Sequence, residues 1–372
     1  MGSQRSKPRG KVTPLANKNR ALDASQLPES YFTWPGLFGR LGRREELSES
    51  QVQWAMQEIM AGKATDAQIA AFSFGLRVKG ISAAELAAAA ETMKSFATPV
   101  DFSDISSVDI VGTGGDGHHT VNISTMASFV VAATGVPVVK HGNRAASSKC
   151  GGADMLEAMG LDIERDPTAV RQDSQHTGFA FMYAKTYHPA MRFAGPVRSE
   201  LGAPTIFNLL GPMTNPASPK YGLIGCAFRE FMPIMGGAFA HQGSRVLVVR
   251  GMDGMDEISV CTPTDVVTVD SNGVTGEAII NPRAVGLDFY EEGSLAGGDA
   301  AYNADVAQRL FSGEITGAIK DAVLINAAGA LTAYHGWEDS TLDEAMRGNV
   351  ERARQALESG AALQQMNKIL GA

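Results

Sequence analysis

Apolar residues at helical spacing mark the first third of the chain. Between Val52 and Met60 they recur at intervals of three and four residues, which places them on one face of a helix. Comparable apolar faces follow at about 69–76 and 86–93. Residues 38–100 are therefore predicted to form a small helical bundle. Each of the three helices begins with a capping box, in which two side chains satisfy free backbone N–H groups: Ser48-x-x-Gln51, Thr65-x-x-Gln68 and Ser82-x-x-Glu85.

After residue 100 the pattern changes to short apolar runs that alternate with longer amphipathic segments. Val108–Val111 and Val136–Val139 have the composition of buried strands, and helices are predicted from about 124 to 134 and from 154 to 159. Alternating strands and helices are typical of an α/β domain with a mostly parallel central sheet, which is the fold class that we predict beside the helical domain. The same pattern predicts later strands at 205–209, 222–226 and 245–250, and helices at 303–312, 319–333 and 341–358.

Length, charge and cysteine content narrow the class of protein. The 372 residues fit two domains at about 150 residues each. A net charge of −8 argues against a general nucleic-acid-binding protein, which is usually basic. Three cysteines without a C-x-x-C pair give no disulfide framework and favour the reducing cytoplasm. No apolar run is long enough to cross a membrane.

Glycine-rich loops follow the first two predicted strands of the α/β region. Gly112–Gly117 has the G-x-G-x-x-G spacing of dinucleotide-binding folds, but the acidic residue that such folds place about 20 residues later is missing. The stretch 117–153 contains no Asp or Glu, whereas Lys140 and Arg144 lie within it. Backbone N–H groups of glycine-rich loops and helix N-termini bind phosphate well. Both loops are therefore predicted to bind a phosphate-rich anion.

A third loop carries the negative charge that a metal ion would need. Asp253, Asp256 and Glu257 follow the predicted strand 245–250. Adjacent Asp256 and Glu257 repel each other unless a cation lies between them. Mg²⁺ commonly accompanies phosphate ligands and is held by one or two carboxylates. The residues alone leave two interpretations open, a magnesium site or an exposed acidic turn.

Several long motifs in one order resemble the anthranilate phosphoribosyltransferases of tryptophan biosynthesis. The motifs are GTGGD, the N-x-S-T segment, KHGNRAASS followed by GGAD, NLLGPMTNP and GMDGMDE; the run GGDAAYN and Asn326 also fit. The resemblance extends from about Leu37 to Leu370. It implies transfer of a phosphoribosyl group from phosphoribosyl diphosphate to the amino group of anthranilate, with release of pyrophosphate. It also implies a homodimer whose active site lies at the hinge between a small α domain and a larger α/β domain.

With this resemblance the domains can be given bounds. The first twenty residues hold six Lys and Arg, no acidic residue and no apolar stretch of the kind found in secretory signals. We interpret residues 1–33 as a flexible basic tail. We expect 34–104 to be the α-helical domain, joined by helices from about 190–215, and 105–372 to be the α/β catalytic domain that binds phosphoribosyl diphosphate.

The resemblance further implies the site residues. Anthranilate would meet Gly112, Asn143 and Arg198, with Arg198 facing its carboxylate, and Mg²⁺ would be held by Ser124, Asp256 and Glu257. No residue is assigned as a nucleophile, because the ribose C1 can lose pyrophosphate through a transition state with oxocarbenium character. The residues expected to bind phosphoribosyl diphosphate are Gly112, Gly115, Asp116, Thr120, Asn122, Ile123, Ser124, Thr125, Lys140, His141, Gly142, Asn143, Arg144, Ala145, Ala146, Ser147, Ser148 and Gly152.

The chain departs from the pattern of this family at two positions. Gly152 stands where many members have serine, and Lys185 stands where members commonly have proline near the anthranilate path. Alternatives are therefore a phosphoribosyltransferase for another aromatic amine, a nucleoside phosphorylase of the related fold, and a non-catalytic nucleic-acid-binding relative. The Asp256–Glu257 pair argues against the second, and the acidic net charge argues against the third. We expect neither a membrane nor a nucleic acid as a partner.

Overall fold

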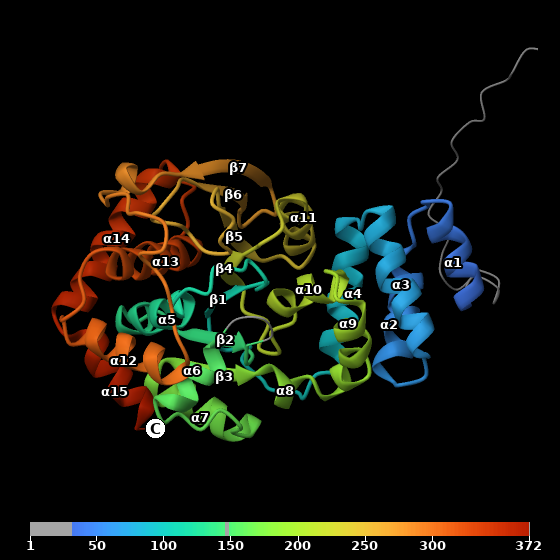
Figure 1. Ribbon diagram of the computed structural model, residues 1–372, viewed down its shortest axis with the longest axis horizontal. Helices are drawn as coiled ribbons and strands as arrows, with labels where there is room; N and C mark the ends of the chain where they lie inside the picture. Colours follow the sequence, from blue (N-terminus) through green and yellow to red (C-terminus); the bar gives the residue numbers. More distant parts are fainter. Residues whose placement is uncertain (1–31, 146–148, 372) are drawn as a thin grey trace, which may run out of the picture.

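The computed structural model describes residues 32–145 and 149–371, and its first helices form a bundle at one end of the molecule (Figure 1). This bundle comprises α1 (Trp34–Gly42), α2 (Glu49–Met60), α3 (Asp66–Lys79) and α4 (Ala83–Ser95). The predicted helical bundle is confirmed, and so are the three capping boxes at the starts of α2, α3 and α4. The predicted basic tail falls almost entirely on residues 1–31, which lie outside the described residues.

A buried ion pair joins the helices of the bundle. Lys79 Nζ donates to Glu85 Oε2 at 2.7 Å, and the two side chains are 3% and 1% exposed. The Glu85 carboxylate also accepts from the backbone N–H groups of Leu47 and Ser82, both at 2.8 Å. A buried carboxylate is tolerated when hydrogen bonds satisfy it in this way. Glu85 thereby connects the segment before α2, the end of α3 and the start of α4.

The larger part of the molecule is built on a seven-stranded sheet in the order β3-β2-β1-β4-β5-β6-β7. From β3 to β5 in the sheet order, each strand is parallel to its neighbour. Strand β6 is antiparallel to β5, and β7 is antiparallel to β6. The predicted α/β class with a mostly parallel sheet is confirmed. The strands are β1 (Val108–Gly112), β2 (Val138–Gly142), β3 (Phe179–Tyr183), β4 (Tyr221–Gly225), β5 (Arg245–Gly251), β6 (Thr264–Val269) and β7 (Thr275–Ile280).

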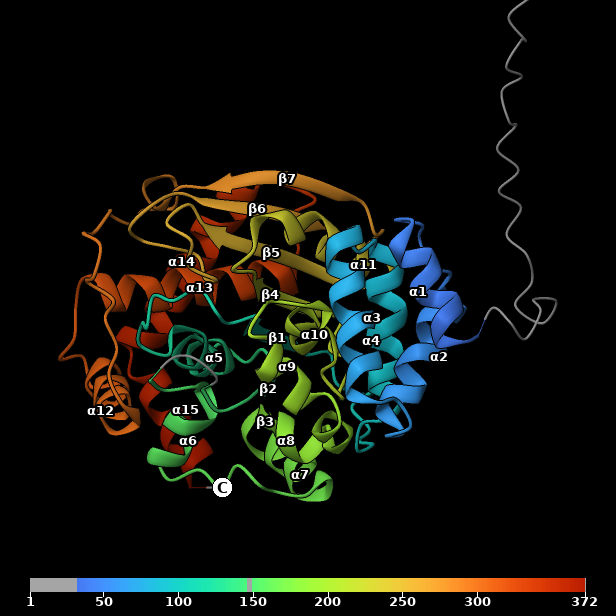
Figure 2. The same cartoon turned by 45° about the vertical axis from the view of Figure 1, so that its right-hand side comes forward.

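Helices cover both faces of the sheet (Figures 1 and 2). Leu223 and Val249 of one face pack with α5 (Ile123–Ala133) and α13 (Ala318–His335). The other face packs against the bundle through α11 (Met232–His241). The remaining helices and turns are α6 (Gly152–Ala158), α7 (Pro167–Thr177), α8 (Ala184–Tyr187), η3 (Pro189–Arg192), α9 (Gly195–Leu201), α10 (Ile206–Leu210), η4 (Gly211–Met213), η5 (Arg229–Phe231), η6 (Pro282–Val285), α12 (Ala300–Phe311), α14 (Leu342–Glu358) and α15 (Ala361–Leu370).

The strand predicted at 205–209 is wrong, because this segment forms helix α10. Thr205 begins the helix, and its capping box includes the side chain of Asn208. Phe207 and Leu210 are buried in the same apolar core as the helical bundle. A short apolar run fits a buried strand and a buried helix equally well, so only the packing partner decides between them. Among the described helices none is both long and apolar enough to cross a membrane.

Candidate active site

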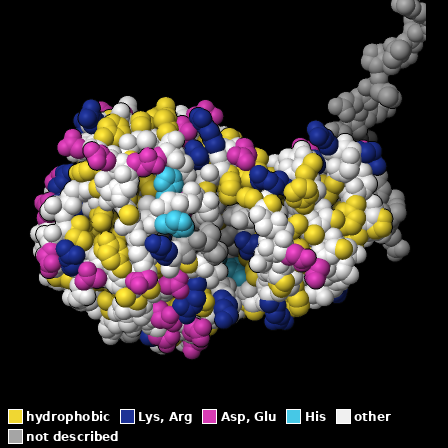
Figure 3. Space-filling model, in the orientation of Figure 1, with side chains coloured by type: hydrophobic (Ala, Val, Ile, Leu, Met, Phe, Trp, Pro, Cys, Tyr) yellow, Lys and Arg dark blue, Asp and Glu magenta, His cyan; other side chains and the backbone are white. Residues whose placement is uncertain are grey.

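A cavity of about 740 Å³ lies where β1 and β2 end, between the sheet and the helical bundle. Met93 at the end of α4, Arg198 on α9 and Phe207 on α10 line its bundle side. Figure 3 shows the surface hollowed between the larger and the smaller lobe, with Lys and Arg side chains beside the hollow. Ligands of open α/β sheets bind at the carboxyl ends of the strands, and this cavity has that position.

The cavity brings together every predicted site residue that the structure describes. Ala146, Ser147 and Ser148 lie outside the described residues. Sequence reasoning missed Asn208 and Pro212, which belong to the NLLGPMTNP motif and also line the cavity. It missed Met93, Met191 and Phe207 as well, and their apolar side chains give no signal that separates a binding wall from an ordinary core.

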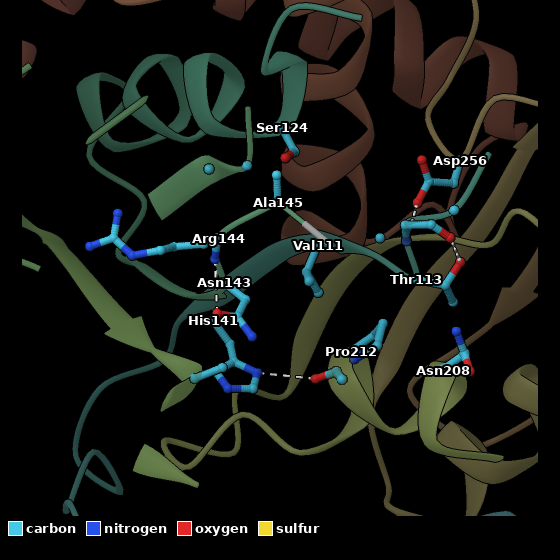
Figure 4. A pocket seen from close by; sticks show the side chains of 18 of the residues that line it. Val111, Thr113, Ser124, His141, Asn143, Arg144, Ala145, Asn208, Pro212 and Asp256 are labelled. Atoms are coloured by element: carbon cyan, nitrogen blue, oxygen red, sulfur yellow. Dashed lines mark hydrogen bonds between the residues drawn. The ribbon is translucent and has the colours of Figure 1, made fainter. Parts of the chain in front are cut away.

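The first glycine-rich loop is fitted closely to the acidic loop. A side chain at Gly112 would place its Cβ 2.3 Å from Asp256 Oδ2, so only glycine leaves room for this carboxylate. The backbone N–H of Gly114 donates to the same oxygen at 2.7 Å. In return, the Asp256 N–H donates to Asp116 Oδ2 at 3.3 Å. The two loops therefore hold Asp116 close to Asp256 at the edge of the cavity, and Figure 4 shows Asp256 there.

The three carboxylates of the acidic loop divide into two roles. Asp253 turns away from the cavity, since its carboxylate accepts from Ser259 Oγ at 2.6 Å and from the Met255 N–H at 3.1 Å. Asp256 and Glu257 face the cavity. Asn326 of α13 fixes the backbone of the next residue, Ile258. Its Oδ1 accepts from the Ile258 N–H and its Nδ2 donates to Ile258 O, both at 2.9 Å.

Negative charge at this point is poorly compensated. Burial, followed by the charge of Asp116, raises the pKa of Asp256 to about 7. Burial, followed by the charge of Asp256, raises the pKa of Glu257 to about 8. Lys140 is the neighbouring cation that lowers the pKa of Glu257, and its ammonium also donates to Ile110 O and to Ser124 Oγ at 3.2 Å. A divalent cation would remove the repulsion, so the donor set fits Mg²⁺.

No three His, Cys, Asp or Glu side chains of the described ranges converge as metal ligands around a single point. A site formed by Ser124, Asp256 and Glu257 would therefore need oxygen atoms from the phosphate ligand or water. This composition is ordinary for Mg²⁺, which usually keeps several waters and binds one or two carboxylates together with substrate phosphates.

We expect the metal-free protein to lose stability as the pH rises. Carboxyl groups with raised pKa values bind protons more tightly in the folded state than in the unfolded state. Their contribution to the free energy of unfolding is therefore fully present below the unfolded pKa of about 4. It is lost as the pH rises through the folded values of about 7 and about 8. In a chelator, the melting temperature should fall between about pH 5 and about pH 9, and Mg²⁺ should reverse this fall. Thermal melts with and without Mg²⁺ measure both effects. An Asp256→Asn, Glu257→Gln double variant with the same pH slope would contradict the assignment.

The second glycine-rich loop is closed by Asp154 of α6. Asp154 Oδ2 accepts from the N–H groups of Ala145 at 2.9 Å and Gly151 at 2.8 Å. Arg144 is held on the same helix by Asp154 at 3.1 Å and by Glu157 at 2.7 Å, and these bonds raise its pKa. Figure 4 shows its side chain directed away from Asp256. The backbone of this loop, rather than the Arg144 guanidinium, is therefore the part presented to the cavity in this structure.

A cationic side chain stands at the opposite wall of the cavity. Arg198 of α9 is half-buried and makes no ion pair within the part of the chain that the structure describes. Burial lowers its pKa, so the guanidinium gains from an anionic partner. Lys185 and Arg192 also line the cavity but are exposed, and Arg192 stacks over the Phe193 ring at 4.6 Å.

Two buried histidines lie between these walls. The rings of His141 and His188 are 5.0 Å apart, and His141 Nδ1 lies 3.0 Å from Gly211 O (Figure 4). Burial lowers the pKa of His141 to about 3 and that of His188 to about 4. Both rings are therefore neutral at pH 7 and are weak proton acceptors. These pKa values are those of residues that pack and form hydrogen bonds rather than of groups that take up a proton at pH 7.

The fold and cavity define a glycosyl transferase with two parts. The helical bundle domain of the glycosyl transferase family matches residues 36–97, and the a/b domain of that family matches residues 104–363. Among curated relatives, an anthranilate phosphoribosyltransferase of Corynebacterium jeikeium is 79% identical and covers 97% of this chain and 98% of that protein. One from Rhodococcus jostii is 49% identical over 89% of this chain and 90% of that protein. The chain therefore belongs to the anthranilate phosphoribosyltransferase family.

Solved structures agree with this assignment. The anthranilate phosphoribosyltransferase of Thermus thermophilus superposes with a TM-score of 0.84 and 38% identity, covering 90% of this chain and 98% of that one. The enzyme from Saccharomyces cerevisiae, solved in complex with phosphoribosyl diphosphate and Mg, superposes with a TM-score of 0.81 and 25% identity over 92% of this chain and 98% of that one.

Proposed function

We propose that this protein transfers the phosphoribosyl group of phosphoribosyl diphosphate to the amino group of anthranilate, the phosphoribosyl transfer step of tryptophan biosynthesis. One observation carries the proposal: the same cavity is lined by two glycine-rich loops and, on the facing wall, by Arg198, which has no ion-pair partner among the described residues. The loops suit the phosphate groups of the donor, and a guanidinium suits the carboxylate of the acceptor. The products are N-(5-phosphoribosyl)anthranilate and pyrophosphate.

The residues of the cavity act by binding and orientation. The backbone N–H groups of the loop after β1 and the N-terminus of α5 stabilise the negative charge that gathers on departing pyrophosphate. Arg198 holds anthranilate so that its amine faces the ribose C1, which supplies proximity. The aromatic amine is neutral at pH 7, so the reaction does not require a strong base, consistent with neutral His141 and His188.

Magnesium is the cofactor that we propose for the reaction. Ser124, Asp256 and Glu257 would hold it beside the diphosphate, and the yeast relative solved with phosphoribosyl diphosphate and Mg supports this role. When bound, Mg²⁺ neutralises charge on the leaving group. The raised pKa values of Asp256 and Glu257, caused first by burial and then by neighbouring carboxylates, support a cation at this point.

The domain bounds remain part of the proposal. We place the α-helical domain at 34–104 with helices from about 190–215, and the α/β domain at 105–372. Ala194, Val197 and Met213 pack in the same apolar core as α1 to α4, which supports this division. The cavity then lies between the two domains, so a change in their angle would open or close it. The three cysteines are free, which supports a cytoplasmic enzyme.

We also propose that the enzyme is a homodimer that pairs through the helical bundle. Phe74 and Val78 lie one turn apart on α3 and are 47% and 55% exposed, which leaves an apolar face for a second copy. Phe74→Glu should convert the dimer to monomers in sedimentation velocity, whereas Val274→Glu, at an exposed turn, should not. A wild-type monomer at micromolar concentration would contradict the proposal.

The proposed reaction is tested by the choice of acceptor. Pyrophosphate release from phosphoribosyl diphosphate should require both Mg²⁺ and anthranilate. Aniline, which keeps the aromatic amine and lacks the carboxylate, should be a much poorer acceptor because Arg198 would be left unpaired. Equal rates with both amines would show that the protein serves another aromatic amine. Pyrophosphate release that needs free phosphate and no amine would show that the acceptor is not an aromatic amine.

A further inference from the structure

A chain of amide hydrogen bonds connects α12 with both glycine-rich loops. Asn303, in the first turn of α12, is 1% exposed. Its Oδ1 accepts from the Gly298 N–H at 2.9 Å, and its Nδ2 donates to Asn122 Oδ1 at 2.8 Å. Asn122 Nδ2 in turn donates to Cys150 O at 3.2 Å, and the Cys150 thiol donates to Asn122 Oδ1 at 3.3 Å. One buried amide thus fixes a second amide that joins the loop after β1 to the loop after β2.

These bonds change what Asn122 does at the start of α5. Asn122 is the N-cap residue of this helix, a position where an Asn side chain ordinarily accepts from the helix's own first turn. Here it makes no such capping bond, because Asn303 and Cys150 occupy its amide. Asn122 therefore joins two loops instead of capping α5. The N-terminal turn of α5, which includes Ser124 and Thr125, faces the cavity without this cap.

The segment before α12 is built against the same loop. The Val121 N–H donates to Leu295 O at 3.0 Å, and the Gly297 N–H donates to His119 O at 2.9 Å. A Cβ on Gly297 would lie 2.5 Å from Thr120 O, so no side chain fits between the two segments. This pairing contacts the loop after β1 on the side away from the cavity. It also places Asn303 within hydrogen-bond distance of Asn122.

We propose that Asn303 is a positioning residue for donor binding: it orients Asn122 so that the two glycine-rich loops stay together and the start of α5 remains open to phosphate. The proposal rests on the proposed function, because it assumes that phosphoribosyl diphosphate binds along these loops. Asn303 acts through Asn122 and does not line the cavity. Its substitution should therefore affect binding of the donor and leave the anthranilate wall at Arg198 unchanged.

Asn303→Asp is the most direct test, since it keeps the size of the side chain and an acceptor for the Gly298 N–H. Its second oxygen would face Asn122 Oδ1, so the donating bond is replaced by repulsion. We expect the dissociation constant for phosphoribosyl diphosphate, measured by calorimetry with Mg²⁺, to rise about tenfold, a change of the size found when one buried hydrogen bond is lost. The KM for anthranilate should change less than about twofold, well below the tenfold that one lost hydrogen bond produces.

Asn349→Asp is the matched control for a purely structural effect. Asn349 is also a buried amide, 6% exposed, and donates to Thr332 Oγ1 at 2.9 Å on α13, away from the cavity. This variant should lower the melting temperature and leave donor affinity unchanged. If Asn303→Asp gives no folded protein, Asn303→Ser takes its place, because its hydroxyl keeps one of the two bonds.

A double-mutant cycle then tests whether Asn303 acts through Asn122. Adding Asn303→Ala to Asn122→Ala should weaken donor binding no further than Asn122→Ala alone, because the two residues form one unit. Additive effects, or unchanged donor affinity in Asn303→Asp, would overturn the proposal. Calorimetry needs no turnover, so a wild-type protein that binds phosphoribosyl diphosphate without using anthranilate would refute the proposed function and leave this inference standing. Failure of wild-type donor binding would refute both.

Discussion

Replacing Asp256 with Asn and Glu257 with Gln is expected to lower kcat/KM by about a thousandfold or more, at saturating Mg²⁺. The reason is that the two carboxylates are the part of the cavity suited to hold the cation beside the leaving diphosphate. Metal stabilisation of developing charge is worth several kcal/mol, and about 1.4 kcal/mol corresponds to a tenfold change in rate. The double variant should remain folded, and its metal-free form should be more stable than the wild type above about pH 7, because it lacks two groups with raised pKa values.

Asp253→Asn is the matched control for this experiment. Asp253 lies on the same loop and carries the same charge, but its carboxylate is bonded to Ser259 and to the backbone of Met255. This variant should keep most of the activity at ordinary Mg²⁺ concentrations. Near-normal turnover of the double variant would show that the cation is held elsewhere.

Replacing Arg198 with Ala is expected to raise the KM for anthranilate about tenfold to a hundredfold, because a charge-assisted hydrogen bond is worth about 1.5–3 kcal/mol. Arg198 is half-buried in the cavity wall and has no ion-pair partner among residues 32–145 and 149–371. Donor affinity should be unchanged, since the glycine-rich loops lie on the opposite side. Steady-state kinetics with each substrate varied in turn separates the two effects.

Lys185→Pro provides the comparison for an exposed cation at the same cavity. Lys185 lies on α8 and lines the cavity, but its side chain is exposed. Its charge therefore acts on the acceptor through solvent that screens it. We expect a change in the anthranilate KM of less than about threefold, the range of an exposed ion pair. Anthranilate activity that appears only in Lys185→Pro would mean that this chain uses another acceptor. An Arg198→Ala variant with unchanged acceptor KM would mean that another residue holds the carboxylate.

Local patterns predicted the parts of the fold that depend on local chemistry. The capping boxes at Ser48, Thr65 and Ser82 start helices because the two side chains and the backbone N–H groups that they bind are neighbours in sequence. The glycine-rich loop at Gly112 was likewise visible, since it directly follows an apolar run. Thr205–Leu209 was misassigned because its apolar run is equally suited to a strand, and only contact with the bundle decides for a helix.

The candidate site shows the same division between local and distant causes. Motifs indicated Asp256 and Glu257, which line the same cavity as the glycine-rich loops, but nothing local showed that Asp253 turns to Ser259. Arg144 is of a residue type that commonly binds phosphate, yet ion pairs with Asp154 and Glu157 hold its side chain on α6. These pairings depend on residues brought together by folding. The roles of side chains within a motif were therefore less predictable than the position of the motif itself.

The central claim is that one cavity joins the two substrates, and the intrinsic fluorescence of anthranilate tests it most directly. Purified protein mixed with anthranilate, phosphoribosyl diphosphate and Mg²⁺ should consume the anthranilate signal in a steady reaction. Omission of phosphoribosyl diphosphate, or chelation of Mg²⁺, should stop the loss. A signal that stays constant with all components present and the protein folded would contradict the account.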